Sequence, residues 1–261
     1  MSLHNHHEGE AELIIGEDSP LRRLPTSLDR KQMLFLDGIR YSGEMADLAH
    51  ARLQQSLYRL AADQSSSERF DHLDALSAVQ DAWSMVDSLH RLRGLIRQMP
   101  GFKQNTPNMR VFRQQTDKVE DLRNAVQHLN HEIDKLVGAN QTVWGSLSWF
   151  ASPGPDAGTG TIGLLVAGTV FTSEGHPMVN PAGKELHGLV DLVTLTAYGH
   201  SLNLSNAMRH VERLIKNMED QSKEQFADHP TAAGELLLCA QVRFDGTEVA
   251  VDQVDSEGEN L

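Results

Sequence analysis

Three polar residues in one segment of the chain have side chains that could act together on a substrate: Arg123, Asn124 and His128. An imidazole titrates near neutral pH and can take a proton from a hydroxyl group, and a guanidinium can stabilise negative charge as it develops. An asparagine one helical turn before the histidine could orient the ring or bind a phosphate oxygen. These residue types therefore suit acid–base chemistry at a phosphate group.

The surrounding residues predict that this set lies on a helix. Apolar residues of segment 117–137 recur every three or four positions, which is typical of a helix buried along one side. They are Val119, Leu122, Val126, Leu129, Ile133 and Leu136. Thr106 and Pro107 suit a helix start and Gly138 suits a helix end, so the pattern predicts one helix of about 30 residues.

The helical geometry constrains how the three side chains can cooperate. At about 100° per residue, Asn124 and His128 share a face, while Arg123 lies about 140° from His128. One copy of the helix cannot easily close all three side chains around one atom. We therefore expect a second copy to complete the site, which predicts a homodimer joined through its helical half with this helix at or near the interface.

The run Leu-Arg-Asn-Ala-Val-Gln-His at 122–128 resembles the Arg-polar-x-x-x-His signature of the HEPN superfamily. Proteins of that family are α-helical and include many RNA-cleaving toxins and defence nucleases. The resemblance implies a helical bundle whose signature helices meet across a dimer interface. It also implies that Arg123, Asn124 and His128 form a metal-independent ribonuclease site. The chain departs from the family pattern because its helix continues past His128 and a β-containing segment follows.

A structural role would also account for these residues. Arg123 could pair with Glu120 or Asp121, and His128 could simply face solvent on the surface of a bundle. A short motif alone does not separate this alternative from a catalytic site.

The charge distribution bears on RNA binding in two opposed ways. The net charge of −13 opposes general affinity for nucleic acid. Segment 88–113, however, contains cationic residues and no Asp or Glu. Its candidate RNA-binding residues are Arg91, Arg93, Arg97, Lys103, Arg110 and Arg113. The alternative is that these side chains are solvated and are balanced by acidic residues of the first helix.

Other classes of site receive little support from the sequence. Cys239 lies in the apolar run LLLCAQV, which predicts a buried thiol in a strand. No His-Glu-x-x-His motif or cysteine pair indicates a metal, and we expect no cofactor. No apolar run approaches the roughly 20 residues that span a membrane, and the first residues lack the pattern of a signal peptide, so we expect a cytoplasmic protein.

The hydrophobic patterns predict a mainly α protein with a smaller β part: an antiparallel bundle of three to four helices followed by a small antiparallel sheet. Residues 1–25 are predicted to be a flexible acidic segment and 26–138 the bundle, with helices ending near Asp63 and Pro100. Residues 139–261 are predicted to form an α+β region packed on the bundle. Within it we expect a hairpin at 142–172, a strand at 189–198 that could instead begin a helix, a helix at 206–226 and a last strand at 235–245.

Two functions remain open from the sequence. The first is a HEPN-like RNA-binding protein of a bacterial defence or toxin–antitoxin type, with metal-independent cleavage of RNA. The second is a non-enzymatic helical module that binds a protein partner through its β-containing half.

Overall fold

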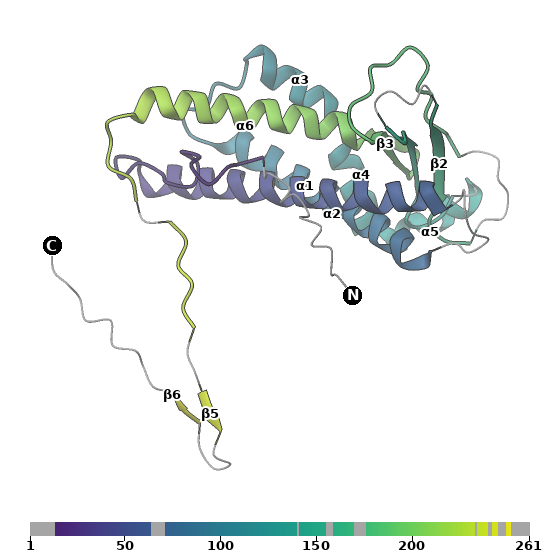
Figure 1. Cartoon of the computed structure of the whole chain (residues 1–261), viewed down its shortest axis with the longest axis horizontal. Coiled ribbons are helices and arrows are strands. Elements are labelled where there is room, and N and C mark those ends of the chain that lie inside the picture. Colours follow the sequence, from purple (N-terminus) through teal and green to yellow (C-terminus); the bar gives the residue numbers. More distant parts are fainter. Residues whose placement is uncertain are drawn as a thin grey trace, which may run out of the picture.

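The computed structural model describes residues 14–63, 71–139, 141–154, 159–169, 176–232, 234–239, 242–244 and 249–251. Two long antiparallel helices form its centre, α1 (Arg30–Asp63) and α2 (His72–Gln98). A third long helix, α6 (Leu204–Phe226), lies along α1 and runs in the opposite direction (Figure 1). The predicted mainly α architecture with a smaller β part is confirmed.

Local sequence explains where these helices begin. Asp29 and Gln32 form a reciprocal capping box, in which Gln32 N donates to Asp29 Oδ1 at 2.8 Å and Asp29 N donates to Gln32 Oε1 at 3.2 Å. Asp71 caps α2 by accepting hydrogen bonds from Leu73 N and Asp74 N. The side chain of Asn203 caps α6 through Asn206 N at 2.7 Å.

The predicted helix over 106–138 is wrong as a single element. The structure divides it into α3 (Pro107–Gln115), α4 (Lys118–Gln127) and α5 (Leu129–Gly138). The first break falls at Thr116, whose hydroxyl donates to Phe112 O at 2.7 Å and accepts a hydrogen bond from Arg93 Nη1 of α2 at 2.6 Å. The second break falls at His128, which has φ −102° and ψ 28° and lies between α4 and α5.

A four-stranded antiparallel sheet lies at one end of the helices, with strand order β2-β1-β3-β4. The strands are β1 (Ser146–Ala151), β2 (Thr161–Val166), β3 (Val190–Ala197) and β4 (His200–Asn203). The predicted hairpin at 142–172 is confirmed, and the ambiguous run at 189–198 is a strand.

A β-bulge in β3 allows two consecutive residues to be buried. Ser148 pairs with Thr194 and Phe150 pairs with Asp191, so Leu192 and Val193 both lie opposite Trp149. Leu192 has φ 58°, and both it and Val193 are buried. Regular alternation would have placed one of these two side chains on the other face of the sheet.

One hydrophobic cluster joins the helices to the sheet. It includes Ile39 and Leu53 of α1, Leu89 of α2, Leu195 of β3 and Met208 of α6. Part of the predicted flexible segment also belongs to this cluster, because Ile15 and Leu21 are buried while residues 1–13 lie outside the described part.

The predicted last strand over 235–245 is also wrong in its extent and its partner. The short strand β5 (Val242–Phe244) pairs with β6 (Val249–Val251), and this hairpin stands apart from the rest of the molecule (Figure 1). Residues 234–239 form no strand, and Cys239 is exposed rather than buried. A strand needs a neighbouring strand to pair with, and the apolar composition of residues 234–239 could not show whether the fold provides one.

Candidate functional site

Arg123 lies on α4 and faces α2. Its Nε donates to Asp87 Oδ1 at 3.1 Å, and Asp87 also forms an ion pair with Arg91. The partner of Arg123 is therefore an acidic residue of the neighbouring helix rather than Glu120 or Asp121 of its own. Because Asp87 neutralises part of its charge, Arg123 is less available to a phosphate group than the sequence suggested.

The other two members of the predicted catalytic set point to solvent. Asn124 and His128 are exposed, and His128 lies at the break between α4 and α5. Among the described residues, no hydrogen bond or ion pair joins the side chains of Arg123, Asn124 and His128 to one another. One chain therefore does not show them as an assembled site.

His90 of α2 is a neighbour of Arg123 that the sequence did not single out. Partial burial lowers the pKa of His90, and the positive charge of Arg123 lowers it further, whereas Glu120 and Asp87 act in the opposite direction. The signal in the sequence was its spacing, since His90 lies three residues after Asp87 and three before Arg93 on one helix.

Arg93 and Arg97 of α2 lie close to Arg113 of α3, and Arg110 of α3 lies one helical turn before Arg113. We call these four residues the arginine strip. Arg93 Nη1 donates to Arg113 O at 3.0 Å and to Thr116 Oγ1 at 2.6 Å. Burial lowers the pKa of Arg93; Arg97 and Arg113 lower it further, while Glu120 and Asp117 raise it. These like charges are thus close enough to repel one another.

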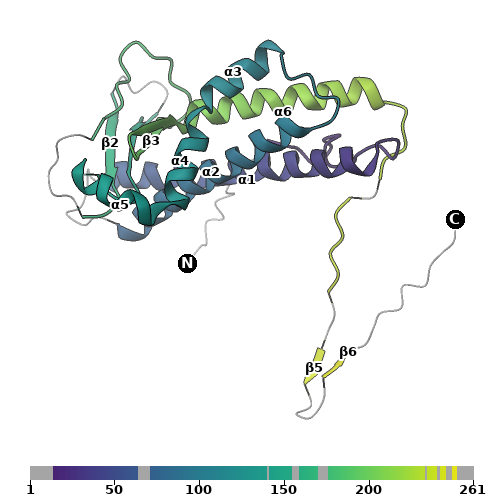
Figure 2. The same ribbon diagram turned by 180° about the vertical axis from the view of Figure 1, so that it is seen from behind.

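The residues of the arginine strip differ in how firmly they are held. Arg93 is half-buried, and Arg113 donates to Gln104 Oε1, whose own amide group donates to Ile96 O. Arg97 and Arg110 are exposed, and no hydrogen bond or ion pair engages their side chains within the described part of the chain. Figure 2 shows the side of the molecule on which α3 and α4 lie. The other two predicted RNA-binding residues differ, because Arg91 pairs with Asp87 and Lys103 lines a cleft.

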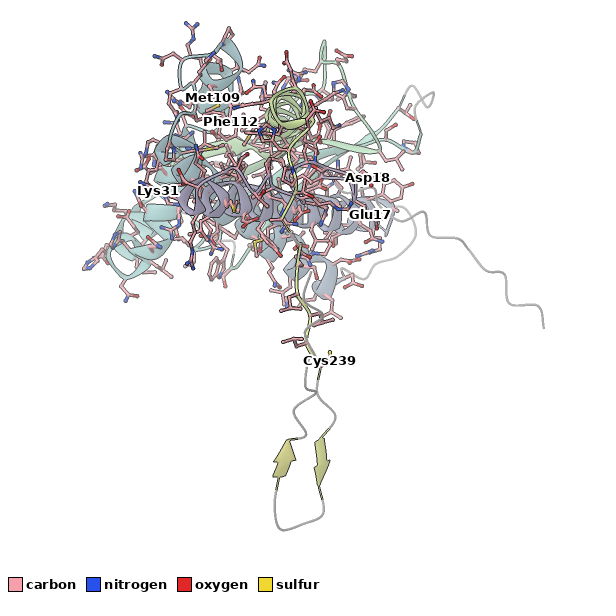
Figure 3. The ribbon with its side chains drawn as sticks, turned by 90° about the vertical axis from the view of Figure 1, so that its left-hand side faces the viewer. Glu17, Asp18, Lys31, Met109, Phe112 and Cys239 are labelled. Atoms are coloured by element: carbon pink, nitrogen blue, oxygen red, sulfur yellow. The ribbon has the colours of Figure 1, made fainter. Side chains whose placement is uncertain are left out.

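That cleft has a volume of about 820 Å³ and lies between α1, α3, α6 and the segment that joins α2 to α3. Its apolar lining includes Leu36, Met109 and Met218, and its polar lining is mainly amide and hydroxyl groups. Met109 and Phe112 project from α3 towards α6 (Figure 3). The arginine strip and the cleft therefore use different faces of α3.

A second polar cluster is buried where α1, β3 and α6 meet. Asp191 accepts hydrogen bonds from Leu192 N at 2.6 Å, His187 N at 2.8 Å and Arg209 Nη1 at 2.9 Å. Burial opposes ionisation of Asp191, but these hydrogen bonds outweigh it and lower its pKa. Nearby, burial lowers the pKa of His50 to about 4 despite the opposing charge of Asp191. Because the buried ion pair of Asp191 with Arg209 joins β3 to α6, we assign these groups a structural role.

The described residues contain no group of three or more His, Cys, Asp or Glu side chains that could hold a metal ion. None of the helices in the described part of the chain is long and apolar enough to cross a membrane. No protein-family model matches the chain, and neither the curated proteins nor the solved structures include a significant match to it.

Proposed function

We propose that this protein binds RNA through the arginine strip. The observation that carries the proposal is the convergence of Arg93, Arg97 and Arg113, whose mutual repulsion a bound phosphate would relieve. Arginine suits this role because its planar guanidinium can donate two parallel hydrogen bonds to one phosphate group.

In this proposal the arginines that are fixed by hydrogen bonds and the exposed arginines have different roles. Arg93 and Arg113 are fixed by hydrogen bonds to α3 and to Gln104, so they hold the two helices in register. Arg97 and Arg110 extend from this fixed base into solvent, where they can reach the phosphate backbone. The net charge of −13 opposes binding of RNA elsewhere by general electrostatic attraction, so the proposal depends on this local group of cations.

The HEPN resemblance supports the choice of RNA as ligand, and cleavage is the stronger form of the same proposal. Cleavage requires Arg123 and His128 from one or two chains to meet at a scissile phosphate. In one chain Arg123 is paired with Asp87 and His128 faces solvent. We therefore propose RNA binding as the activity of the single chain and expect no turnover from it.

The binding proposal is tested with a double variant and a matched control. Arg97→Ala with Arg110→Ala removes two exposed cations of the arginine strip, and Arg213→Ala with Lys216→Ala removes two exposed cations of α6. For a single-stranded RNA, each lost phosphate contact reduces the magnitude of the negative slope of log K against log salt by about 0.7. We expect the first pair to reduce this magnitude by about 1.4 and to weaken binding at least tenfold.

The α6 pair should leave the slope unchanged and should weaken binding by no more than about twofold, because it makes the same change of charge at a different place. Equal effects of the two pairs would show that binding depends on total charge and would contradict a site at the arginine strip. Incubation of the wild-type chain with mixed RNA in EDTA tests cleavage separately. Cleavage that His128→Ala abolishes would establish the ribonuclease instead.

A further inference from the structure

The cleft that Lys103 lines is a recess that neither the arginine strip nor Arg123 enters. Its sides are formed by α1, α3, α6 and the segment that joins α2 to α3. Its volume of about 820 Å³ falls within the range of about 300–1,000 Å³ that is usual for small-molecule sites. The chemistry of its lining residues indicates what kind of ligand would fit.

Two parallel rows of side chains from α6 line the cleft. Asn217, Gln221 and Gln225 follow each other at intervals of four residues and form a row of carboxamides. Leu214 and Met218 begin an apolar row beside it, because positions three and four apart lie on the same face of a helix. Successive members of one row are about 6 Å apart along the helix axis. This side of the cleft therefore offers an apolar surface with hydrogen-bonding groups along one edge.

The carboxamide row is available to a ligand. Within the described part of the chain, no hydrogen bond or ion pair engages the side chains of Asn217, Gln221 and Gln225. Asn217 is also half-buried, so its amide group is partly shielded from water. A carboxamide in this position can donate and accept hydrogen bonds in one plane.

The other sides of the cleft suit a flat, uncharged ligand. Phe102 comes from the segment between α2 and α3, Met109 comes from α3, and Phe226 ends α6. Phenylalanine rings stack on flat heterocycles, and methionine sulfur makes favourable contacts with aromatic rings. Among the described lining residues, only Lys103 and Glu224 carry charge. The centre of the cleft is thus neutral, and a cation is present at one place.

We propose that this cleft binds an adenine nucleotide, with the base between α3 and α6 and the phosphate beside Lys103. A carboxamide fits adenine because its oxygen accepts from the exocyclic amine while its nitrogen donates to the neighbouring ring nitrogen. Guanine presents two acceptors on the same edge and pairs better with arginine, which is absent from the described lining. A pyrimidine has one ring instead of two and would cover less of the apolar row.

The adenine nucleotide could be free in solution or an unpaired nucleotide of an RNA. Lys103 precedes Gln104, and Gln104 accepts a hydrogen bond from Arg113 of the arginine strip. An RNA held by the strip would therefore have phosphates near Lys103 and could place one unstacked base in the cleft. Binding of the free nucleotide does not require RNA binding by the strip, so the two proposals can fail separately.

Titration of the full chain with adenosine monophosphate, followed by calorimetry, tests the site. We expect saturable binding of one equivalent, at least about fivefold tighter than binding of guanosine or uridine monophosphate, because one bidentate pair provides discrimination of this size. Lys103→Gln should weaken binding of the monophosphate severalfold at low salt and leave binding of adenosine unchanged. Equal binding of the three nucleotides, or no saturable binding up to about 1 mM, would overturn the proposal.

A pair of substitutions of nearly equal size tests the carboxamide row. Asn217→Leu with Gln221→Met should weaken binding of adenosine monophosphate at least tenfold and leave the melting temperature unchanged. The matched control is Gln127→Met with Asn130→Leu, which makes the same changes at exposed positions of α4 and α5. Equal effects of the two pairs would contradict a site in the cleft.

The arginine strip variant separates this proposal from RNA binding. Arg97→Ala with Arg110→Ala should leave binding of adenosine monophosphate within about twofold of wild type. The carboxamide pair should weaken binding of oligoadenylate but not of oligouridylate if RNA supplies the base. If it weakens neither while binding of the monophosphate is lost, the ligand is the free nucleotide. A wild-type chain that binds RNA through the strip but binds no adenosine monophosphate would refute the cleft site alone.

Discussion

Asp87 limits the chemistry that the Arg-Asn-x-x-x-His segment can perform. Its carboxylate pairs with both Arg91 and Arg123, so two cations that border the arginine strip are already engaged. The side chain of Asp87 is 39% exposed, and ion pairs at such positions contribute only about 0–1 kcal/mol to stability. The carboxylate therefore matters more to the local charge than to the fold.

Replacing Asp87 by Asn should accordingly strengthen RNA binding. Removal of one negative charge beside the arginine strip releases Arg91 and Arg123 towards the phosphate backbone, and we expect a threefold to tenfold lower dissociation constant at low salt, on the order of 1 kcal/mol. Filter binding measures the change. Asp220→Asn, an exposed site on α6, serves as control and should have little effect. Weaker binding of Asp87→Asn would mean that this carboxylate positions the site.

The low pKa of His50 leads to a prediction of how the free energy of unfolding depends on pH. Its pKa is about 4 in the folded chain, below the 6.5 of an ordinary histidine. Between pH 6.5 and 4 the unfolded chain therefore binds a proton that the folded chain does not, and stability falls as the pH falls. The loss approaches about 3 kcal/mol at most.

His50→Gln should flatten the dependence of the unfolding free energy on pH in that window, as followed by urea denaturation. His131→Gln, at an exposed position of α5, should keep the wild-type slope. A variant of His50 with an unchanged slope would assign the acid sensitivity to other groups. The low pKa of Asp191 acts separately, because its contribution is lost only below the ordinary aspartate value of 3.8.

At the scale of elements, the hydrophobic periodicity of the sequence predicted the helices and strands whose apolar residues follow a regular spacing. The stripes of apolar residues located α1, α2 and α6 closely, and the alternation after Val143 located the β1–β2 hairpin. The run 189–198 could not be assigned from the sequence, because the bulge at Leu192 and Val193 breaks the alternation. That bulge is set by tertiary contacts of β3 with β1 and α6.

The division of the 106–138 helix was equally hidden, because its cause lies in another helix. Arg93 of α2 binds both Arg113 O and Thr116 Oγ1 and so fixes the end of α3. The same holds for the candidate site. The sequence identified the arginine strip as part of a group of six cations that also contained Arg91 and Lys103. The partner of Arg123 and the proximity of His90 depend on how α2 and α4 pack, which the sequence does not show.

Two glycines give opposite expectations for the same substitution. Gly163 pairs with Trp149 across β1 and β2, and a Cβ at this position would lie 2.2 Å from the indole ring. Gly163→Ala should therefore destabilise the protein by roughly 1–3 kcal/mol.

Gly94 lies inside α2, where a Cβ would meet nothing within 4 Å. Gly94→Ala should raise stability by about 0.5–1 kcal/mol, because alanine is favoured in helices. Thermal unfolding followed by circular dichroism distinguishes these signs. Tolerance of alanine at Gly163 would show that the indole can move away from β2.

At the scale of the whole molecule, the helices and the four-stranded sheet share one core, whereas the β5–β6 hairpin stands apart (Figure 1). A chain that ends at Cys239 keeps residues 234–239 and loses the hairpin. Its melting temperature should stay within about 2 °C of the full chain, since roughly 1 kcal/mol corresponds to 2–4 °C for a protein of this size. Differential scanning calorimetry provides the measurement. A fall of more than about 5 °C would mean that the hairpin belongs to the folded core.

The two ends of the body are joined by a short backbone contact. Thr26 N donates to Pro230 O at 2.9 Å, Ala232 N donates to Leu24 O at 2.8 Å, and Pro25 and Thr231 form a β-bridge. Neighbouring ends of this kind make a protein suitable for circular permutation. A linker of a few glycines from residue 232 to residue 14, with new termini opened at the exposed Gly183, should therefore yield a folded permutant that lacks the β5–β6 hairpin.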